Sequence, residues 1–330
     1  MILGVKLFRT LHVLIRLQRN QRYAKLQHWT DIFFSFFSIH KQCRLHQKRI
    51  IMTCTSSFTY SDIDWMQLWK NDRAQRSWSS KGAADWDKKA ASFAERNNQS
   101  PYNSLFLSRL PLEPSFSVLD VGSGPGTLAL PLARLVRSVT AIDYSRQMLE
   151  VLQSRMKNEG ISNITCAHCS WEDDWQQYQI EPADLVIASR SMNVAELSLA
   201  IDKLNDYAKK YVFISDRIAP SPFDPDVFAA IGREFNSGPD YIYTMNLLYS
   251  KAIHPNVEIL ELTRNFEFRD MDEAIESYNW MIKDISTSEL RKLKQFVQSR
   301  AVMTEKDRVI ITRRHPPRWA LIWWKKQPTC

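Results

Sequence analysis

The sequence predicts an α/β protein built on a doubly wound, mostly parallel sheet. Short apolar runs suited to buried strands alternate with helical patterns between residues 117 and 215. A turn with three glycines follows the first run, and aromatic residues make up 12% of the 330 residues, including eleven tryptophans. Strands that alternate with helices pair in parallel, and the aromatic content indicates a packed body rather than disorder. A chain of this length can bury one large core or two smaller ones.

The first 51 residues differ in charge from the rest of the chain. Residues 1–51 contain ten lysines and arginines and one acid, Asp31, so the net charge of this segment is +9. The net charge of the whole chain is +8. The remainder is close to neutral, which argues against a nucleic-acid surface on the body. Such a segment suits an organellar presequence, a nucleic-acid or membrane-surface arm, or upstream sequence translated from a misplaced start. We favour the last interpretation, with the working protein beginning at Met52.

A helical cap is expected over residues 52–110, ahead of the sheet. Apolar side chains recur there near helical spacing, at Trp65, Leu68, Trp69, Trp78, Trp86, Ala90 and Phe93. They predict two or three short helices. Aromatic side chains of this kind serve equally well as core or as the wall of a ligand pocket, and both interpretations stay open.

The first strand, Ser117–Val121, runs into Gly122, Gly124 and Gly126, and a helical pattern follows over residues 127–136. A strand, a glycine turn and a helix together present backbone N–H groups and a helix N-terminus to a ligand. Glycine suits this turn because the backbone angles are unusual and the ligand approaches closely. Dinucleotide-binding turns have their third glycine five residues after the first, whereas here it comes four after. This spacing argues against an oxidoreductase that uses a nicotinamide cofactor.

The second strand, residues 139–144, ends in an acid. Asp143 lies 17 residues beyond Gly126, where an acid at the end of a second strand can bind a ribose diol. A carboxylate suits this role because it accepts two hydroxyl hydrogen bonds at once. The apolar stripe over residues 148–156 then predicts a helix that packs on the core.

The third predicted strand, residues 164–169, contains Cys166 and Cys169 and leads into the polar run Ser170–Asp174. A zinc site needs a second pair of ligands at matching spacing, and none follows, so a buried strand that happens to carry cysteines is favoured. The five cysteines of the chain are scattered, which indicates a reducing compartment and therefore a cytoplasmic location. Because no apolar run approaches the roughly 18 residues of a spanning helix, no membrane span is expected.

Two more strands complete the parallel set. The run Ala183–Ser189 is apolar throughout its middle, as a central parallel strand is, and it delivers the segment Ser189–Asn193 to the edge where ligands bind in open α/β sheets. A helix over residues 197–208 and a strand over 211–215 follow.

The last third of the chain departs from this alternation. Prolines and aromatic residues gather over residues 218–256, and a strand is predicted at 257–262. Two helices, 272–282 and 288–302, fall within an insertion at 270–305. The closing runs 309–312 and 319–324 are separated by Pro316 and Pro317, and we expect them to form an antiparallel hairpin at the sheet edge.

The pattern Asp120-x-Gly122-x-Gly124-x-Gly126 resembles motif I of the class I S-adenosylmethionine (SAM) dependent methyltransferases. With Asp143 and the strand order, the chain is more loosely similar to their UbiE-like small-molecule branch. The resemblance runs from about Asp62 to the end. It implies a Rossmann-like SAM-binding domain over 111–330, with a late antiparallel strand, an N-terminal helical cap, and a helical insertion before the last strand. The insertions at 218–256 and 270–305 would line the substrate pocket.

The resemblance also implies which residues bind SAM, the methyl donor. Asp120 would hold the methionyl amino group, the glycine turn would pass against the donor, Asp143 would bind the ribose, and the acidic loop after the third strand would contact adenine. The residues expected at the donor are Asp120, Gly122, Ser123, Gly124, Gly126, Asp143, Tyr144, Trp171, Glu172 and Ser189.

The implied reaction is direct displacement, in which an O, N, S or C nucleophile of a small-molecule acceptor attacks the methyl group. A general base is optional in such enzymes. Asp216, Tyr241, Tyr243 and His254 are candidates, each better explained as structural, and no catalytic residue is assigned. The segment after the fourth strand lacks the Asn/Asp-Pro-Pro-aromatic run of enzymes that methylate base or glutamine nitrogens. It also lacks the Pro-Cys nucleophile of enzymes that methylate cytosine C5. Two alternatives stay open: a SAM-binding protein without turnover, and an RNA or protein methyltransferase that uses residues 1–51 as a basic arm.

Overall fold

The computed structural model describes residues 59–78, 82–98, 100–279, 282–304 and 308–327. The predictions for the basic extension 1–51 lie outside the described residues. Contacts divide the chain into two units, Met1–Ile63 and Asp64–Cys330. In the first unit the described part is a 3-10 turn, Tyr60–Asp62, in which Asp62 accepts hydrogen bonds from the backbone and hydroxyl of Thr59.

A seven-stranded sheet in the order β3-β2-β1-β4-β5-β10-β6 forms the centre of the second unit. The strands are β1 Ser117–Val121, β2 Ser138–Asp143, β3 Ile164–His168, β4 Ala183–Ser189, β5 Ala208–Arg217, β6 Asn256–Glu261 and β10 Arg318–Lys325. Strands β1 to β5 are parallel, and β10 runs antiparallel between β5 and β6. The predicted fold class is confirmed, including the late antiparallel strand.

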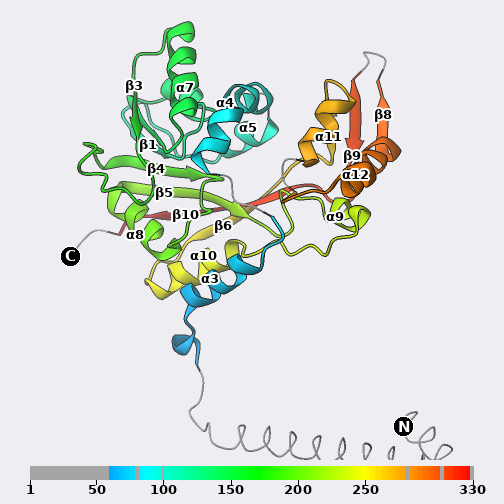
Figure 1. Cartoon of the computed structure of the whole chain (residues 1–330). Helices are drawn as coiled ribbons and strands as arrows, with labels where there is room; N and C mark the ends of the chain where they lie inside the picture. Colours follow the sequence, from blue (N-terminus) through cyan, green and yellow to red (C-terminus); the bar gives the residue numbers. More distant parts are fainter. Residues whose placement is uncertain (1–58, 79–81, 99, 280–281, 305–307, 328–330) are drawn as a thin grey trace, which may run out of the picture. The chain divides into compact units, whose positions relative to one another are not determined.

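Helices cover both faces of this sheet (Figure 1). They are α3 Trp65–Gln75, α4 Ala83–Asn98, α5 Pro101–Leu107, α6 Ala129–Ala133, α7 Arg146–Glu159, α8 Leu197–Tyr207 and α10 Tyr241–Ser250. One core joins α5, α6 and α7 to one face, and another joins α3, α8 and α10 to the opposite face. Strand β1 contributes side chains to both faces of the sheet, because Val118 lies in the first core and Leu119 in the second.

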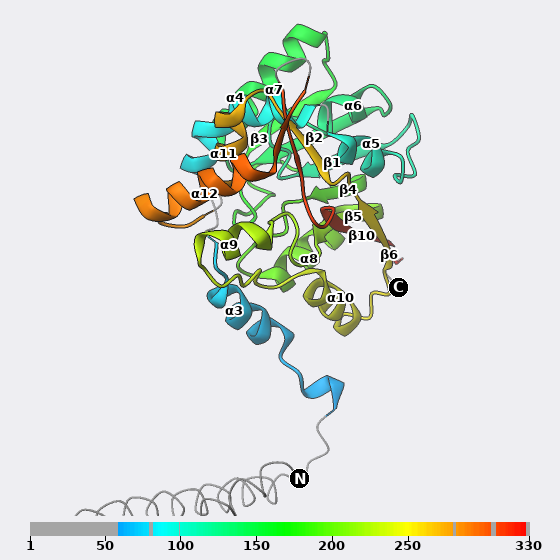
Figure 2. The ribbon, with the colours of Figure 1, turned by 90° about the vertical axis from the view of Figure 1, so that its right-hand side faces the viewer.

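A smaller lobe is formed by the chain between β6 and β10, together with a helix that lies between β5 and β6 in the chain. Its three-stranded sheet has the order β7-β9-β8, and its core includes three helices (Figure 2). The elements are α9 Pro225–Ile231, β7 Asn265–Phe268, α11 Met271–Asn279, α12 Thr287–Arg300, β8 Ala301–Met303 and β9 Val309–Thr312. The predicted helical insertion before the last strand is therefore present, and it also contains strands.

The predicted closing hairpin is wrong. Strand β9 pairs with β7 and β8, whereas β10 pairs with β5 and β6. The reason lies in the two burial patterns. From Trp319 to Ile322 every residue of β10 is buried, so this strand needs cover on both faces and neighbours on both sides. Strand β9 buries alternate residues, Val309 and Ile311, as a strand with one covered face does.

Two boundaries also differ from the sequence prediction. The helix expected over residues 127–136 is reduced to α6, because Gly126 adopts a left-handed conformation, φ +79°, and the helix begins only at Ala129. Pro131 then falls in its first turn, where no N–H donor is needed. Strand β5 begins at Ala208, directly after α8, three residues earlier than expected.

In the part of the chain that the structure describes, no helix combines the length and apolarity needed to cross a membrane. Cys166 and Cys169 are free thiols. Burial raises the pKa of both, to about 11 for Cys169. Among the described residues, no three His, Cys, Asp or Glu side chains are grouped so as to hold a metal ion.

Candidate functional site

The glycine turn after β1 contains three residues with positive φ, +72° at Gly122, +54° at Gly124 and +79° at Gly126. The three glycines have different roles. A Cβ on Gly122 would lie 2.5 Å from Ser191 Cβ, and one on Gly126 would lie 2.3 Å from Leu152 Cδ1, whereas a Cβ on Gly124 would meet nothing within 4 Å. Two glycines therefore permit close packing within the protein, and Gly124 leaves the open face that a ligand can approach.

Asp143, at the end of β2, fixes the shape of this turn. Its Oδ2 accepts a hydrogen bond from Gly124 N–H at 2.8 Å, and its Oδ1 accepts one from Ser145 N–H at 2.8 Å. The carboxyl is 6% exposed. Burial raises its pKa, and the two backbone hydrogen bonds oppose that shift. An ionised carboxylate has about four acceptor positions, so lone pairs remain for a diol beside Gly124.

Three polar atoms around the turn are buried without a hydrogen-bond partner among the described residues: Asp120 Oδ2, Ser123 Oγ and Thr127 Oγ1. Asp120 is 2% exposed, and burial, with a contribution from the charge of Asp143, raises its pKa to about 7. Native proteins seldom leave such atoms unsatisfied, because each costs about 1–3 kcal/mol. Their grouping beside an open glycine indicates a ligand with hydrogen-bonding groups and a cationic end.

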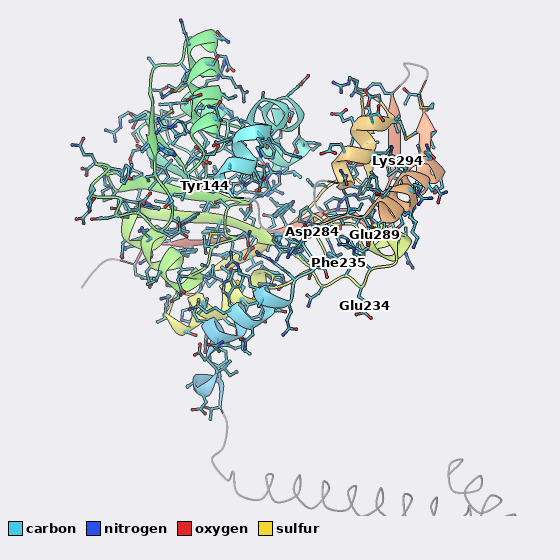
Figure 3. The ribbon with its side chains drawn as sticks, in the orientation of Figure 1. Tyr144, Glu234, Phe235, Asp284, Glu289 and Lys294 are labelled. Carbon is cyan, nitrogen blue, oxygen red and sulfur yellow. The ribbon has the colours of Figure 1, made fainter. Side chains whose placement is uncertain are left out.

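Helix α4 of the cap is tied to this edge of the sheet. Asp87 Oδ1 accepts hydrogen bonds from Ser145 Oγ at 2.6 Å and from Gln147 N–H at 3.2 Å. Tyr144 lies in the same loop (Figure 3) and is 38% exposed. Partial burial raises the pKa of Tyr144 to about 12. The cap therefore lies beside the loop that follows β2.

The loop after β3 is held by its own hydrogen bonds. Asp173 accepts one from Ser170 N–H at 2.7 Å, and Lys203 Nζ donates to the carbonyl of Trp171 at 2.8 Å. The Trp171 ring is half-buried against Trp175, 5.8 Å between ring centres. Glu172 is exposed. The contacts fix this loop, and the predicted adenine contacts of Trp171 and Glu172 stay predictions.

A hydroxyl cluster joins the ends of β4 and β5. Tyr102, fully buried on α5, is hydrogen bonded through its hydroxyl to Ser189 Oγ at 2.7 Å and to Ser215 Oγ. Ser215 Oγ also accepts a hydrogen bond from Arg190 N–H at 3.0 Å. The sequence interpretation included Ser189 and missed Tyr102 and Arg190. One tyrosine in a cap helix and one arginine after a strand have no motif that marks them.

Two of the candidate bases are occupied by structural hydrogen bonds. Asp216 is buried and accepts bonds from Thr244 Oγ1 at 2.6 Å and from Arg217 N–H at 2.7 Å. Tyr243 donates to Asp72 Oδ2 at 3.1 Å, and burial raises the pKa of Tyr243 to about 12. Tyr241 is half-buried and His254 is exposed. Among the described residues, none of the four candidate side chains forms a hydrogen bond with the glycine turn.

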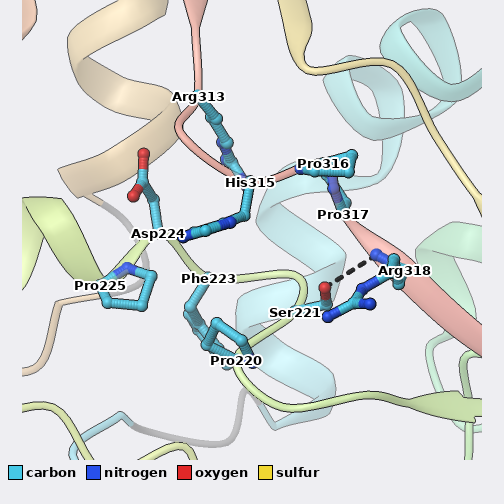
Figure 4. A pocket seen from close by; sticks show the side chains of 10 residues that line it. All are labelled: Pro220, Ser221, Phe223, Asp224, Pro225, Arg313, His315, Pro316, Pro317 and Arg318. Atoms are coloured by element: carbon cyan, nitrogen blue, oxygen red, sulfur yellow. Dashed lines mark hydrogen bonds between the residues drawn. The ribbon is translucent and has the colours of Figure 1, made fainter.

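A cavity of about 190 Å³ lies between the loop 220–225 and the linker 313–318 (Figure 4). Strand β10 begins beside this cavity and is antiparallel to β5, with Trp319 opposite Arg217. The beginning of β10 and the ends of the parallel strands therefore share one edge of the sheet. The cavity opens at the β5–β10 side of that edge, and the glycine turn occupies the β1–β2 side.

One segment of the chain matches a known protein family, and the chain is similar to several known proteins. Residues 118–210 match a family model described as a methyltransferase domain. An uncharacterized protein of Haemophilus influenzae is 34% identical over 269 residues, which cover 81% of this chain and 98% of that protein. The YcgJ protein of Bacillus subtilis is 13% identical over 69% of this chain and 98% of its own, with a TM-score of 0.49. Coclaurine N-methyltransferase, solved with N-methylheliamine and SAH, is 14% identical over 82% and 95%, with a TM-score of 0.41.

Proposed function

Because residues 118–210 match a methyltransferase domain, we propose that the protein is a SAM-dependent methyltransferase. It would methylate an O, N, S or C nucleophile of a small molecule by direct displacement, with SAM as the methyl donor. The bound donor supplies a methyl group that its positive sulfur has already activated, so the protein contributes mainly orientation and a dry pocket.

We propose that the glycine turn holds the methionyl and ribose parts of the donor. Asp120 Oδ2 is buried without a partner in the described part of the chain, which suits an ammonium group. A cation there would lower the pKa of Asp120 from about 7 and keep the carboxylate ionised. Asp143 keeps free lone pairs beside Gly124, which suits the two ribose hydroxyls.

The remaining donor contacts stay proposals from the family resemblance. Tyr144 follows Asp143 directly, and Trp171 and Glu172 lie in the loop after β3, where the adenine would be bound. Ser189, at the end of β4, is held by the Tyr102 hydroxyl. Ser123 Oγ has no partner among the described residues and would donate to or accept from the donor.

A small-molecule acceptor is supported by the size of the space at this edge. The cavity beside β10 has a volume of about 190 Å³, which suits a small group. The part of the chain from Asp62 onward carries no excess of positive charge, so the body lacks the basic surface that nucleic-acid substrates need.

One observation carries the proposal: Asp143 both braces the turn at Gly124 and keeps acceptor positions free beside it. Titration calorimetry of the full chain with S-adenosylhomocysteine (SAH) tests this. We expect the wild type to bind SAH, and Asp143→Ala to weaken binding by about 10- to 100-fold, since charge-assisted hydrogen bonds are lost.

The matched control is Asp202→Ala. This carboxylate forms an ion pair with Lys251 far along the chain from the turn, 2.8 Å apart, and we expect its removal to leave SAH affinity unchanged. Undetectable SAH binding by the wild type, or an Asp143→Ala variant that binds as the wild type does, would contradict the proposal.

A further inference from the structure

Arg190 follows the last residue of β4 and is half-buried. Its guanidinium carbon lies 4.3 Å from the centre of the Tyr102 ring and 5.9 Å from that of Trp319. Among the described residues, no carboxylate or carbonyl accepts a hydrogen bond from this guanidinium. Two aromatic rings therefore contact the cation, and its five N–H groups remain available to donate hydrogen bonds to a ligand.

Two other partly or fully buried arginines among the described residues do have acceptors. Arg217 Nη1 donates to the carbonyl of Ser237 at 2.9 Å, and Arg313 Nη1 donates to that of Pro222 at 2.6 Å. A cation–π contact offsets only about 1–2 kcal/mol of the desolvation of a cation, and burial lowers the pKa of Arg190. A planar guanidinium with free donors is suited to a carboxylate or phosphate, which it binds through two parallel hydrogen bonds.

The backbone and the aromatic rings hold Arg190 in one orientation. Its φ is +56°, a left-handed conformation that costs a non-glycine residue about 1–2 kcal/mol. Its N–H donates to Ser215 Oγ, and the Tyr102 ring beneath the guanidinium is fixed by the two serine hydroxyls. Strain and hydrogen bonds of this kind are common where a side chain is aimed at a ligand.

The guanidinium extends away from the proposed donor site. In the sheet order β2-β1-β4-β5-β10, the donor residues Asp143 and Asp120 lie on β2 and β1. Trp319, which the guanidinium contacts, lies on β10, two strands beyond β4 in the other direction. The guanidinium therefore reaches toward β10, on the side of β4 opposite to the proposed donor residues.

Further basic side chains line the cavity next to Trp319. Arg313 is buried there, and its Nε has no hydrogen-bond partner in the described part of the chain. His315 and Arg318 also line it, both exposed. Asp224 is the one acid among the lining residues. The acceptor side of the edge thus carries a positive potential, which attracts small anions.

We propose that the methyl acceptor is an acidic small molecule, and that Arg190 binds its carboxylate or phosphate group. This inference rests on the proposed function, since it assigns the acceptor of the same reaction. Arg190 is a binding residue that anchors the acid group over β5 and β10 and leaves the nucleophile of the acceptor directed toward β1. Tyr102 and Trp319 position the guanidinium.

The experiment uses the full chain and SAM with a radioactive methyl group. The acceptor source is a deproteinised small-molecule extract of the cells that make the protein, divided on an anion-exchange column at pH 8 into retained and unretained fractions. We expect labelled product from the retained fraction. At limiting acceptor, Arg190→Met should lower the rate of its formation by about 10- to 100-fold, and Arg190→Lys by less, since lysine keeps the charge without the paired geometry.

Two readouts separate this result from a fault in folding or in donor binding. Arg109→Met is the matched control, because Arg109 lies two residues beyond the end of α5 and is already paired with Glu258 at 2.8 Å. This variant should keep the wild-type rate. Calorimetry should give Arg190→Met the SAH affinity of the wild type, which also shows that the variant is folded.

Three results would overturn the inference alone: product from the unretained fraction only, a wild-type rate in Arg190→Met, or loss of SAH binding in that variant. The last would mean that Arg190 binds the methionyl carboxylate of the donor instead. Failure of the wild type to bind SAH, or to label any fraction, would contradict the proposed function, and the inference would fall with it.

Discussion

The two sides of the carboxyl edge of the sheet are built in different ways. On the proposed donor side, the turn at Gly124, the carboxylate of Asp143 and Ser145, which caps α7, come from one stretch of about 30 residues and bond to one another. On the proposed acceptor side, Tyr102, Arg190 and Trp319 come from a cap helix, the end of β4 and the last strand. A site made from one stretch leaves a motif in the sequence, whereas a site assembled across more than 200 residues does not.

The largest expected effect tests whether the glycines of the donor side differ as described. Gly122→Ala would place a Cβ 2.5 Å from Ser191 Cβ, which moves only with the backbone. We expect the free energy of unfolding to fall by about 3–5 kcal/mol. Gly124→Ala meets no atom within 4 Å, so it should cost only the conformational strain, about 1–2 kcal/mol, and yet weaken SAH binding.

Denaturant unfolding and calorimetry on the two variants measure this contrast. Equal losses of stability in Gly122→Ala and Gly124→Ala would show that the open face at Gly124 does not exist. Unchanged SAH affinity in a folded Gly124→Ala variant would remove that glycine from the donor site.

The next effect concerns the buried acid of the donor side. The pKa of Asp120 is raised from 3.8 to about 7 in the folded state, so the folded protein holds a proton that the unfolded chain releases. Its contribution to stability is therefore full below pH 3.8 and is lost as pH rises toward 7, by up to about 4 kcal/mol.

Asp120→Asn should remove this dependence. Denaturant unfolding of the wild type and of the variant, at pH values from 4 to 7.5, measures how the free energy of unfolding of each depends on pH. We expect the variant to gain stability relative to the wild type as pH rises, by about 2–4 kcal/mol at neutral pH. A difference that does not change with pH would mean that Asp120 is already ionised in the free protein.

The smallest effect lies on the acceptor side. Tyr102→Phe removes the hydroxyl between Ser189 and Ser215 and leaves the ring beneath Arg190 in place. We expect the free energy of unfolding to fall by about 1–2 kcal/mol and the acceptor KM to rise more than the SAH dissociation constant does. Steady-state kinetics with the acceptor from the retained fraction measures both. A larger change in SAH affinity than in acceptor KM would place Tyr102 on the donor side.

The same division explains what the sequence predicted. Parallel strands β1 to β5 follow from apolar runs such as Ala183–Ser189, and the glycine turn of the proposed donor site follows from the spacing of Gly122, Gly124 and Gly126, because these signals are local. The predicted pairing of β9 with β10 is wrong, because pairing depends on what covers each face of a strand, and residues distant in sequence supply that cover. Arg190 carries no such local signal, because the two rings that its guanidinium contacts, Tyr102 and Trp319, are distant from it in sequence.

The most direct test of the central claim is a crystal structure of the full chain with SAH bound. The account predicts that the ribose hydroxyls lie within hydrogen-bonding distance of the Asp143 carboxylate, that the methionyl ammonium meets Asp120 Oδ2, and that the Arg190 guanidinium makes no contact with SAH. An SAH molecule bound in the cavity beside β10, or one with its ribose away from Asp143, would contradict it.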